Sequence, residues 1–431
     1  MTRTTPTRLR FGALFAATAL AGGALAGCTS GDGGGDATEI SVTSNFTAGE
    51  ANGDYFAQVA ADFEEETGIT VDIQEVPNDD IADVFEAASL AGEETDVVIL
   101  NLTPDSSDWF PNGLTVDVDQ YLDDWDIRGK LQESAIDYWT QNGGVNGFPY
   151  QGFNWPVWYN TELLAQAGVD EIPATFDDLV DAAEKLRAAG IQPFAMGGNS
   201  WPVQNFITWM GQQYLEPAEA EDVFANGGWC ANPNAVKGLD LFAEMRDAGV
   251  FQDDAEGYDD TQQNTMFFNG QAAMAPLGSW NYASGDLSAE LAEATELAGF
   301  PVVEGGVYGK PTAFQGHGTG LWVTQAGAEK EDAVKQFIQY MYSQPVLAGW
   351  VSEANQILSV TPEAIGDASP DAPLVLKGAT VTEETVDFLI LPDGFIPAGV
   401  DMSPVGSAFL GQDGAGGDVL CAELDALYDA L

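Results

Sequence analysis

The chain has 431 residues, with 68 acidic and 13 basic side chains and one histidine, and its formal net charge is −55. Hydrophobic residues make up 45% of it and aromatic residues 11%, which is ordinary for a globular protein, so the charge does not indicate disorder. A surface this negative repels nucleic acids and anionic lipids, and one histidine with three cysteines excludes most zinc, haem and iron–sulfur sites. We expect two or three domains and no cofactor.

The N-terminus has the pattern of a secretion signal. Three arginines lie within the first ten residues, and residues 11–27 form a short uncharged run of Ala, Leu and Gly. The run ends in Leu25-Ala26-Gly27-Cys28, which resembles the lipobox of bacterial lipoproteins. That resemblance implies that residues 1–27 are a cleaved signal peptide and that lipid is attached to Cys28. An ordinary signal peptide followed by a chance cysteine is the alternative.

Residues 28–36 carry almost no apolar surface, so we expect a flexible tether. No later segment is apolar enough to span a membrane, which favours an extracytoplasmic protein anchored to the outer face of the cell membrane. Removal of residues 1–27 takes away three arginines and no acid, and changes the formal charge from −55 to −58. The two remaining cysteines, Cys230 and Cys421, are expected to form a disulfide, and two buried free thiols are the alternative.

The first part of the mature chain alternates strands with helices. Residues 40–42, 69–73 and 96–100 read as strands, and the last of these is continuously apolar after Asp96. Helices are predicted over residues 55–67 and from Ile81 to the residue before Gly92. This order predicts an α/β fold with a doubly wound parallel sheet, and Asp96 is expected to have a structural role.

The alternation restarts at residue 151. Thr175 and Asp178 approximate a capping box for a helix that ends at Gly190. Later apolar stripes predict further helices and one strand, over residues 236–249, 272–277 (strand), 334–342 and 420–431. Two α/β halves are therefore expected.

Several short motifs occur in a characteristic order: Gly147-Phe148-Pro149-Tyr150, Trp158-Tyr159-Asn160, Ile191-Gln192-Pro193-Phe194, Phe268–Met274 leading into Gly278-Ser279-Trp280, and Gly299-Phe300-Pro301. In this order the mature chain resembles the extracellular solute-binding proteins of carbohydrate ABC importers, the maltose-binding-protein-like group. The resemblance implies a two-lobe periplasmic-binding-protein-like fold with three hinge crossings and a ligand cleft between the lobes. It places lobe I at 37–150 plus 300–350 and lobe II at 151–299 plus 351–431.

The scarcity of basic residues bears on the charge of the ligand. The mature chain has only three arginines, Arg128, Arg187 and Arg246, and none falls on an expected pocket loop. Anionic ligands usually need an arginine clamp, so a neutral, hydroxyl-rich ligand fits better. Sugar sites combine aromatic platforms with amide partners.

Trp280 matches a position of the resembled family that often stacks on a sugar ring, with a place in the core as its alternative. The other candidate ligand contacts follow expected strands or crossings and are Asn45, Phe46, Asn101, Phe153, Asn154, Trp155, Asn199, Trp201 and His317. An asparagine in a loop is often only a turn former, and His317 could be a hinge residue. Trp158 and Trp209 have apolar neighbours and are expected in the core.

Two acidic segments, 117–126 and 253–260, could in principle coordinate calcium. Neither has the spacing of an EF-hand loop, so solvated acidic loops are favoured and no metal site is predicted.

These patterns predict a lipid-anchored, monomeric receptor that has no catalytic residues. It would capture a neutral mono- or oligosaccharide and deliver it to an ABC importer permease. A secreted glycoside hydrolase with paired carboxylates is the main alternative, because 68 acids leave room for such a pair. A single histidine and the lack of a G-x-S-x-G motif argue against a nucleophile–base relay. A structural surface lipoprotein without a ligand is a third possibility, against which the loop aromatics argue modestly.

Overall fold

The computed structural model describes residues 37–78 and 80–431, so the expected signal peptide, tether and Cys28 lie outside the described residues. The first sheet has the order β12-β11-β3-β1-β2, with β6 paired to the other edge of β11. Its strands are β1 (Glu39–Ser44), β2 (Thr70–Glu75), β3 (Val97–Asn101), β6 (Phe148–Trp155), β11 (Thr312–Val323) and β12 (Asp387–Phe388). The pairs β1–β2 and β1–β3 are parallel, as predicted, whereas β11 runs antiparallel to β3 and β6, so the sheet as a whole is mixed.

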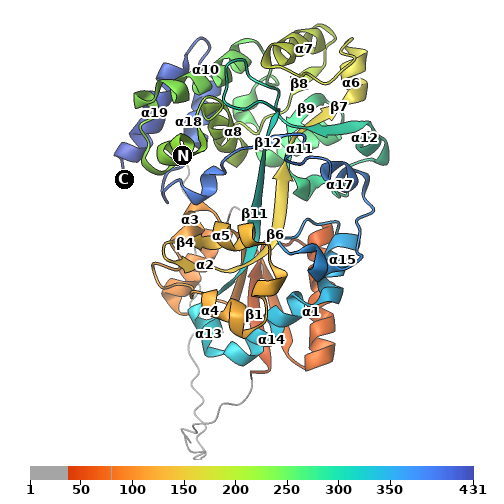
Figure 1. Cartoon of the computed structure of the whole chain (residues 1–431), viewed down its shortest axis with the longest axis vertical. Helices are drawn as coiled ribbons and strands as arrows, with labels where there is room; N and C mark the ends of the chain where they lie inside the picture. Colours follow the sequence, from red (N-terminus) through yellow and green to blue (C-terminus); the bar gives the residue numbers. More distant parts are fainter. Residues whose placement is uncertain (1–36, 79) are drawn as a thin grey trace, which may run out of the picture. The chain divides into compact units, whose positions relative to one another are not determined.

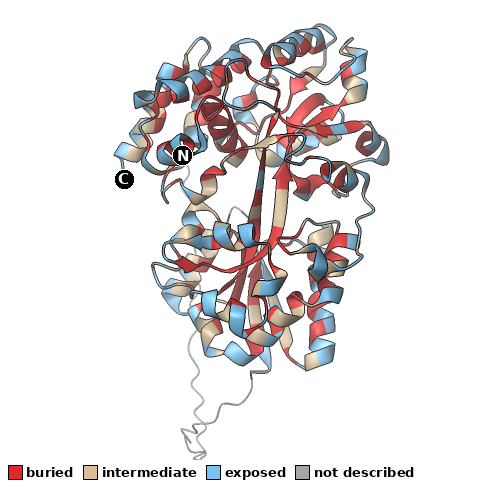
Figure 2. Ribbon diagram, viewed as in Figure 1, coloured by how far each residue is buried: buried red, intermediate tan, exposed pale blue. Residues whose placement is uncertain are grey.

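Helices cover this sheet and bury a first core (Figures 1 and 2). The elements around it are α1 (Ala51–Thr67), α2 (Ile81–Ala91), α3 (Pro104–Ser107), α4 (Asp119–Asp124), η1 (Arg128–Lys130), α5 (Glu133–Trp139), β4 (Thr140–Gln141), β5 (Gly144–Val145), α13 (Gln325–Glu329), α14 (Glu331–Met341), α15 (Gln344–Ser352) and α16 (Pro362–Ile365). The predicted helices 55–67 and 334–342 correspond to α1 and α14.

The second sheet has the order β10-β7-β9-β8 and four strands, β7 (Val157–Asn160), β8 (Gln192–Phe194), β9 (Ala272–Pro276) and β10 (Thr295–Ala298). Its surroundings are α6 (Thr161–Gln166), α7 (Phe176–Ala188), α8 (Trp201–Gly211), α9 (Pro217–Asn226), η2 (Trp229–Ala231), α10 (Pro233–Asp247), η3 (Ala255–Gly257), α11 (Asp260–Phe268), η4 (Ser279–Asn281), α12 (Ala289–Ala294), α17 (Pro373–Gly378), η5 (Pro392–Gly394), α18 (Ser403–Leu410) and α19 (Gly417–Asp429). We call the two adjoining apolar clusters on this sheet the second core. The predicted capping box at Thr175 is present, since its hydroxyl accepts from the amide of Asp178.

The expected lobe boundaries at 300 and 350 do not coincide with the change from one core to the other. Phe300 and Phe314 pack in the second core, whereas Leu321 packs in the first. Leu358 and Val360 also belong to the first core. The physical reason is that β11 is one continuous strand of 12 residues, so the chain passes between cores in the middle of a strand where no sequence signal marks a break.

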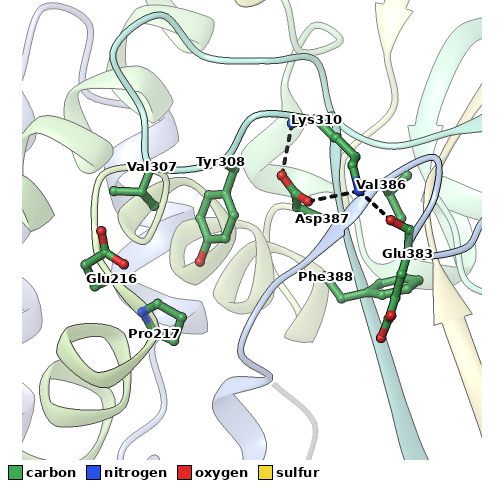
Figure 3. Close-up of a pocket in the computed structure, with 9 residues that line it drawn as sticks. All are labelled: Glu216, Pro217, Val307, Tyr308, Lys310, Glu383, Val386, Asp387 and Phe388. Carbon is green, nitrogen blue, oxygen red and sulfur yellow. Dashed lines mark hydrogen bonds and ion pairs between the residues drawn. The ribbon is translucent and has the colours of Figure 1, made fainter.

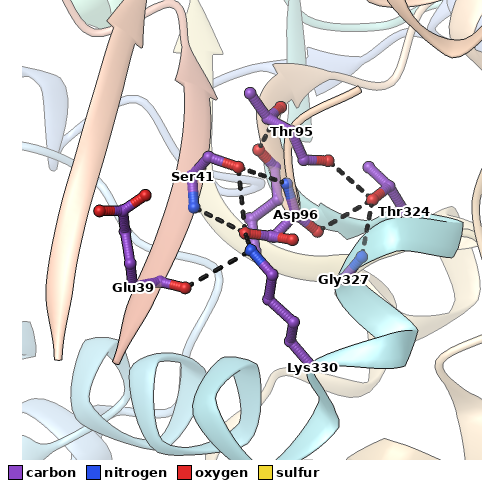
Figure 4. A network of polar contacts seen from close by, with 8 residues as sticks. Glu39, Ser41, Thr95, Asp96, Thr324, Gly327 and Lys330 are labelled. Carbon is purple, nitrogen blue, oxygen red and sulfur yellow. Dashed lines mark hydrogen bonds and ion pairs between the residues drawn. The ribbon is translucent and has the colours of Figure 1, made fainter. Parts of the chain in front are cut away.

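Two tertiary links fix chain segments that are distant in sequence. The disulfide expected between Cys230 and Cys421 is present, with 5.1 Å between the Cα atoms, and it ties α19 to η2. Asp96, expected to be structural, is almost fully buried and accepts hydrogen bonds from the Ser41 amide at 2.7 Å and the Ser41 hydroxyl at 3.0 Å. Lys330 pairs with the same carboxylate at 2.8 Å (Figure 4). This carboxylate therefore joins the start of β3 to β1 and to the start of α14.

Candidate functional site

The strands β6 and β11 carry the residues that link the two cores. Figure 1 shows them side by side, and their pairing runs from Phe314–Trp155 in the second core to Leu321–Phe148 in the first. The register shifts on both sides of Thr319. Shifts of this kind are typical of strands that re-aim side chains near a binding site. At the same level, Gly152 and Phe153 are half-buried in the otherwise buried strand β6 (Figure 2).

Four aromatic side chains gather where β6 enters the second core, and we call them the aromatic group: Phe153, Trp155, Trp201 and Trp280. The Trp280 ring centroid lies 5.8 Å from Phe153, 5.6 Å from Trp155 and 5.9 Å from Trp201. Phe153 and Trp155 are two residues apart on one strand, so they share a face. Phe153 and Trp155, which were expected to line a cleft, both contact Trp280.

Trp280 differs from the other members of the aromatic group in its exposure. It lies in η4, and 41% of its surface is exposed, whereas Trp155 is 4% exposed. A Cβ at Gly278 would lie 2.1 Å from the Trp280 ring, so only glycine lets the indole take this position. An exposed indole held by a specific backbone feature is suited to stack on an apolar face of a ligand.

A polar row lies across the sheet beside the aromatic group. Gln151 is directly opposite Thr319, and Thr319 is directly opposite Asn101, so the three side chains share a face. The Thr319 hydroxyl donates to Asn101 Oδ1 at 2.6 Å. We call these three residues the polar row. Sequence reasoning found Asn101 but missed Gln151 and Thr319, although the polar glutamine in an apolar crossing strand was a usable signal.

Several expected ligand contacts are engaged in the protein's own packing. Phe46 is 3% exposed and packs on Phe56 and Trp350, so the expectation that it faces a ligand is wrong; the strand before it simply continues into the core. Asn154 donates to the Gly378 carbonyl at 3.0 Å and accepts from the Tyr282 hydroxyl at 2.6 Å. Its alternation along β6 turns it away from Phe153, which makes it a structural residue.

Trp155 is likewise a core residue more than a surface platform, because its indole nitrogen donates to the Pro276 carbonyl at 2.8 Å and its ring packs on Trp209 and Phe314. Trp158 and Trp209 are fully buried, as predicted. Of these three tryptophans, Trp155 is the one that contacts the exposed Trp280.

The remaining asparagines hold loops. Asn199 donates to the Gly257 carbonyl at 3.1 Å and so fixes the loop that leads into α8 and Trp201. Asn45 donates to Asn78 at 3.0 Å, while its own Oδ1 is buried and has no hydrogen-bond partner within the described residues. The structure therefore does not bring Asn45 or Asn199 into contact with the aromatic group.

His317 lies in the irregular part of β11 and is held from both sides. Its Nδ1 lies 3.1 Å from the Ser359 hydroxyl and its Nε2 lies 3.0 Å from the Ser134 hydroxyl of α5. Burial lowers the pKa of His317 from 6.5 to about 4, so the imidazole is neutral at ordinary pH. Because both ring nitrogens contact serine hydroxyls, His317 links two segments of the first core to each other.

Tyr138 and η5 connect the cores on another side. Tyr138 of α5 packs against both cores, and its buried hydroxyl has no partner within the described residues. Asp393 of η5 lies near Tyr138, and burial raises the pKa of this carboxyl to about 6. The η5 turn also contacts α3 of the first core.

Two open surface hollows lie elsewhere. One, of about 550 Å³, is lined by residues of the second sheet's surroundings and β12, including Glu216, Tyr308, Lys310 and Asp387 (Figure 3). The other, of about 310 Å³, lies on the surface of the first half of the protein, beside Lys130 and Tyr342. Neither contains a member of the aromatic group or the polar row.

The basic side chains are committed to other partners. Each arginine of the described residues pairs with aspartate: Arg128 with Asp119 and Asp123, Arg187 with Asp253, and Arg246 with Asp247. Three lysines also form ion pairs: Lys310, Lys330 and Lys377. Between residues 37 and 431, apart from residue 79, no basic side chain bonds to the aromatic group or the polar row. These residues therefore have no cationic side chain among their hydrogen-bond partners.

Within the described part of the chain, no three or more acidic, histidine or cysteine side chains are grouped as a metal site would require. The same residues include no helix that is both long enough and apolar enough to cross a membrane.

Two α/β cores joined by continuous strands, with a partly exposed indole and a polar row at the junction, have the architecture of a two-lobe binding protein. Residues 47–347 match the family of bacterial extracellular solute-binding proteins. The match covers more than half of the chain, so the chain belongs to this family. It is a binding protein and not an enzyme, and its family places it outside the cytoplasm.

Relatives support this assignment. A probable secreted solute-binding lipoprotein from Streptomyces coelicolor is 32% identical, with a TM-score of 0.77 over 92% of this chain and 100% of that chain. A chitin oligosaccharide binding protein shares the fold at 23% identity, with a TM-score of 0.79 over 92% of this chain and 99% of that chain. The sn-glycerol-3-phosphate-binding periplasmic protein UgpB of Salmonella typhimurium is 27% identical over 49% of each chain. The chain spans about half the length of the curated relatives it matches, including a putative binding protein of Brucella abortus at 25% identity over 56% of this chain and 57% of that protein.

Proposed function

We propose that the protein captures a neutral mono- or oligosaccharide between its two lobes and delivers it to the permease of an ABC importer. The exposed Trp280 carries the proposal, because a flat, partly exposed indole among other aromatic rings is suited to the apolar face of a sugar ring. The pairing of Arg187 and Arg246 with aspartates supports a neutral ligand. The lobe division and the ligand contacts of Trp280, Trp201, Phe153 and Asn101 are part of this proposal.

An anionic polyol phosphate is the competing ligand, because one relative is named for sn-glycerol-3-phosphate. A phosphate would need arginine, lysine or a helix N-terminus among its contacts, and the arginines here are paired with aspartates. The glycoside hydrolase considered from composition is set aside by the family to which the chain belongs.

Titration calorimetry of the purified protein tests the proposal. The panel contains glucose, galactose, maltose, cellobiose, xylobiose and raffinose, with sn-glycerol-3-phosphate as the anionic comparator. We expect saturable binding of at least one neutral sugar and no heat with the phosphate. Binding of the phosphate without any sugar would overturn the neutral-ligand proposal.

We further propose that the protein is a monomer anchored to the outer face of the cell membrane through lipid on Cys28, which lies outside the described residues. Mass spectrometry of the protein isolated from its host tests the anchor. A mature N-terminus at Cys28 that carries a diacylglyceryl group is expected, and an unmodified N-terminus would contradict the proposal.

A further inference from the structure

Gln151 is a buried polar residue whose amide has no evident structural task. The residue is 8% exposed, and its Nε2 is buried without a hydrogen-bond partner in the described part of the chain. Buried polar groups nearly always have a partner, and leaving one unpaired costs about 1–3 kcal/mol. An unpaired amide donor in a strand therefore calls for a partner that the protein chain does not supply.

The position of Gln151 indicates what that partner is. Gln151 belongs to the polar row with Thr319 and Asn101. On β6 it lies two residues from Phe153, which contacts Trp280, and alternate residues of a strand are about 7 Å apart on the same face. One end of a ring stacked on Trp280 and Phe153 would thus lie within reach of the Gln151 amide.

The chemistry of the row restricts the ligand further. Asn101 Oδ1 already accepts from Thr319, so this pair is preorganised, and Gln151 is the member whose donor is buried and unpaired. An amide N–H donates well to a neutral hydroxyl or ring oxygen, whereas an anion would be left without a counter-charge. A neutral polyhydroxylated ligand satisfies the donor without a new buried charge.

We propose that Gln151 is a ligand-contacting residue that determines specificity, and that its Nε2 donates a hydrogen bond to an oxygen of the sugar ring held by the aromatic group. This inference rests on the proposed function. It gives the strand β6, and not only the loops, a direct role in ligand specificity. A sugar that lacks an oxygen at this end of the ring would leave the donor unpaired and bind more weakly.

The substitution Gln151→Met tests the inference, because methionine keeps the length of the side chain and removes the donor. We expect at least about tenfold weaker binding of the sugar that the wild-type protein binds. The melting temperature should stay unchanged or rise, because the variant no longer buries an unpaired amide. A side chain with a structural role would behave in the opposite way.

Gln132→Met is the matched control for stability. The Gln132 Nε2 donates to the Val360 carbonyl at 3.0 Å and to the Leu358 carbonyl at 3.4 Å, so its loss should lower the melting temperature. A second variant, Gln151→Glu, should bind weakly at neutral pH and regain affinity relative to wild type as the pH falls, because the protonated carboxyl becomes a donor again.

The outcomes separate the inference from the function on which it rests. If the wild-type protein binds no sugar, the proposed function fails. If it binds a sugar and Gln151→Met binds the same sugar equally well, the inference alone fails. A melting temperature that falls as far in Gln151→Met as in Gln132→Met would show that the amide has a structural partner, and would also overturn the inference.

Discussion

At the scale of single residues, the junction of the two cores depends on side chains that the rest of the protein leaves exposed or unpaired. Trp280 is partly exposed although it touches three other aromatic rings. Gly278 makes this possible, since any Cβ there would collide with the indole. A glycine two residues before an exposed tryptophan therefore has a positional role, and its φ of −86° shows that it is not needed for backbone conformation.

The substitution Trp280→Ala should weaken binding of the cognate sugar by tenfold or more, because a stacking platform is lost. The fold should tolerate the change, since the side chain is partly exposed. Gly278→Ala should weaken binding as well by displacing the indole. Calorimetry measures both effects, and Leu90→Ala, which removes a side chain that is 88% exposed, is the control with unchanged affinity. Full affinity in Trp280→Ala would remove Trp280 from the site.

His317 gives the protein a specific pH dependence. Burial lowers its pKa from 6.5 to about 4, so between these values the unfolded chain binds the proton more readily than the folded protein. The contribution of His317 to the free energy of unfolding is therefore fully present above pH 6.5. It is lost as the pH falls towards 4, and the loss is at most about 3 kcal/mol. In His317→Gln, the free energy of unfolding should fall less between pH 7 and pH 4.5 than in wild type.

Denaturant unfolding at several pH values checks this expectation, and equal pH profiles for the two proteins would contradict it.

The pKa shift of Asp393 has the opposite effect on the pH dependence of stability. Burial raises its pKa from 3.8 to about 6, so it favours the folded state at low pH and loses that contribution as the pH rises from 3.8 through 6. Comparison of His317→Gln with wild type cancels the Asp393 contribution, which both proteins share.

At the scale of elements, the first sheet depends on a buried carboxylate at the start of β3. Asp96 accepts from Ser41 of β1 and pairs with Lys330 at the start of α14 (Figure 4). The carboxylate is buried and the ammonium group is partly exposed, so the three contacts mainly satisfy Asp96. They fix the positions of β1, β3 and the start of α14 relative to one another, at the end of the sheet away from the polar row.

Asp96→Ala should lower the free energy of unfolding by about 3 kcal/mol, because it leaves the Ser41 amide without its acceptor and Lys330 without its partner. Asp119→Ala is the matched control. It removes a carboxylate that pairs with Arg128 at 2.6 Å on the surface, and should cost no more than about 1 kcal/mol. Equal losses in the two variants, measured by denaturant unfolding, would contradict the structural role of Asp96.

At the scale of the whole molecule, two cores share the continuous strands β6 and β11 and are linked further by Tyr138. A ligand that contacts residues on both sides of such a junction favours the closed arrangement of the lobes over the open one. The chain has 68 acidic and 13 basic side chains and a formal net charge of −55, so most of the acidic side chains have no basic partner available.

Self-repulsion of this charge should make stability depend on salt. Raising sodium chloride from about 10 mM to about 0.5 M shortens the screening length several-fold, so the melting temperature should rise. Sucrose at matched osmolarity is a control for effects that do not depend on charge. A melting temperature that falls or stays constant with salt would show that the acids do not destabilise the folded protein.

The sequence by itself determined the class of the fold. Period-3.6 and alternating patterns gave α1, α7, α14 and the parallel strands, because those signals depend only on which residues face the core. It also pointed to Trp280 and Phe153, whose contacts the structure places together, and to the scarcity of basic residues.

Only the tertiary structure decided which of the candidate residues take part in the protein's own packing. Asn154 and Phe46 read like pocket residues but bond or pack internally, while Gln151 reads like an ordinary strand residue and has an unpaired donor. The sequence pattern also did not show that β11 begins in the second core and ends in the first. The partners of Asn154 and Phe46 in these contacts lie 128 to 304 residues away in the chain, and a pattern of neighbouring residues carries no information about such pairings.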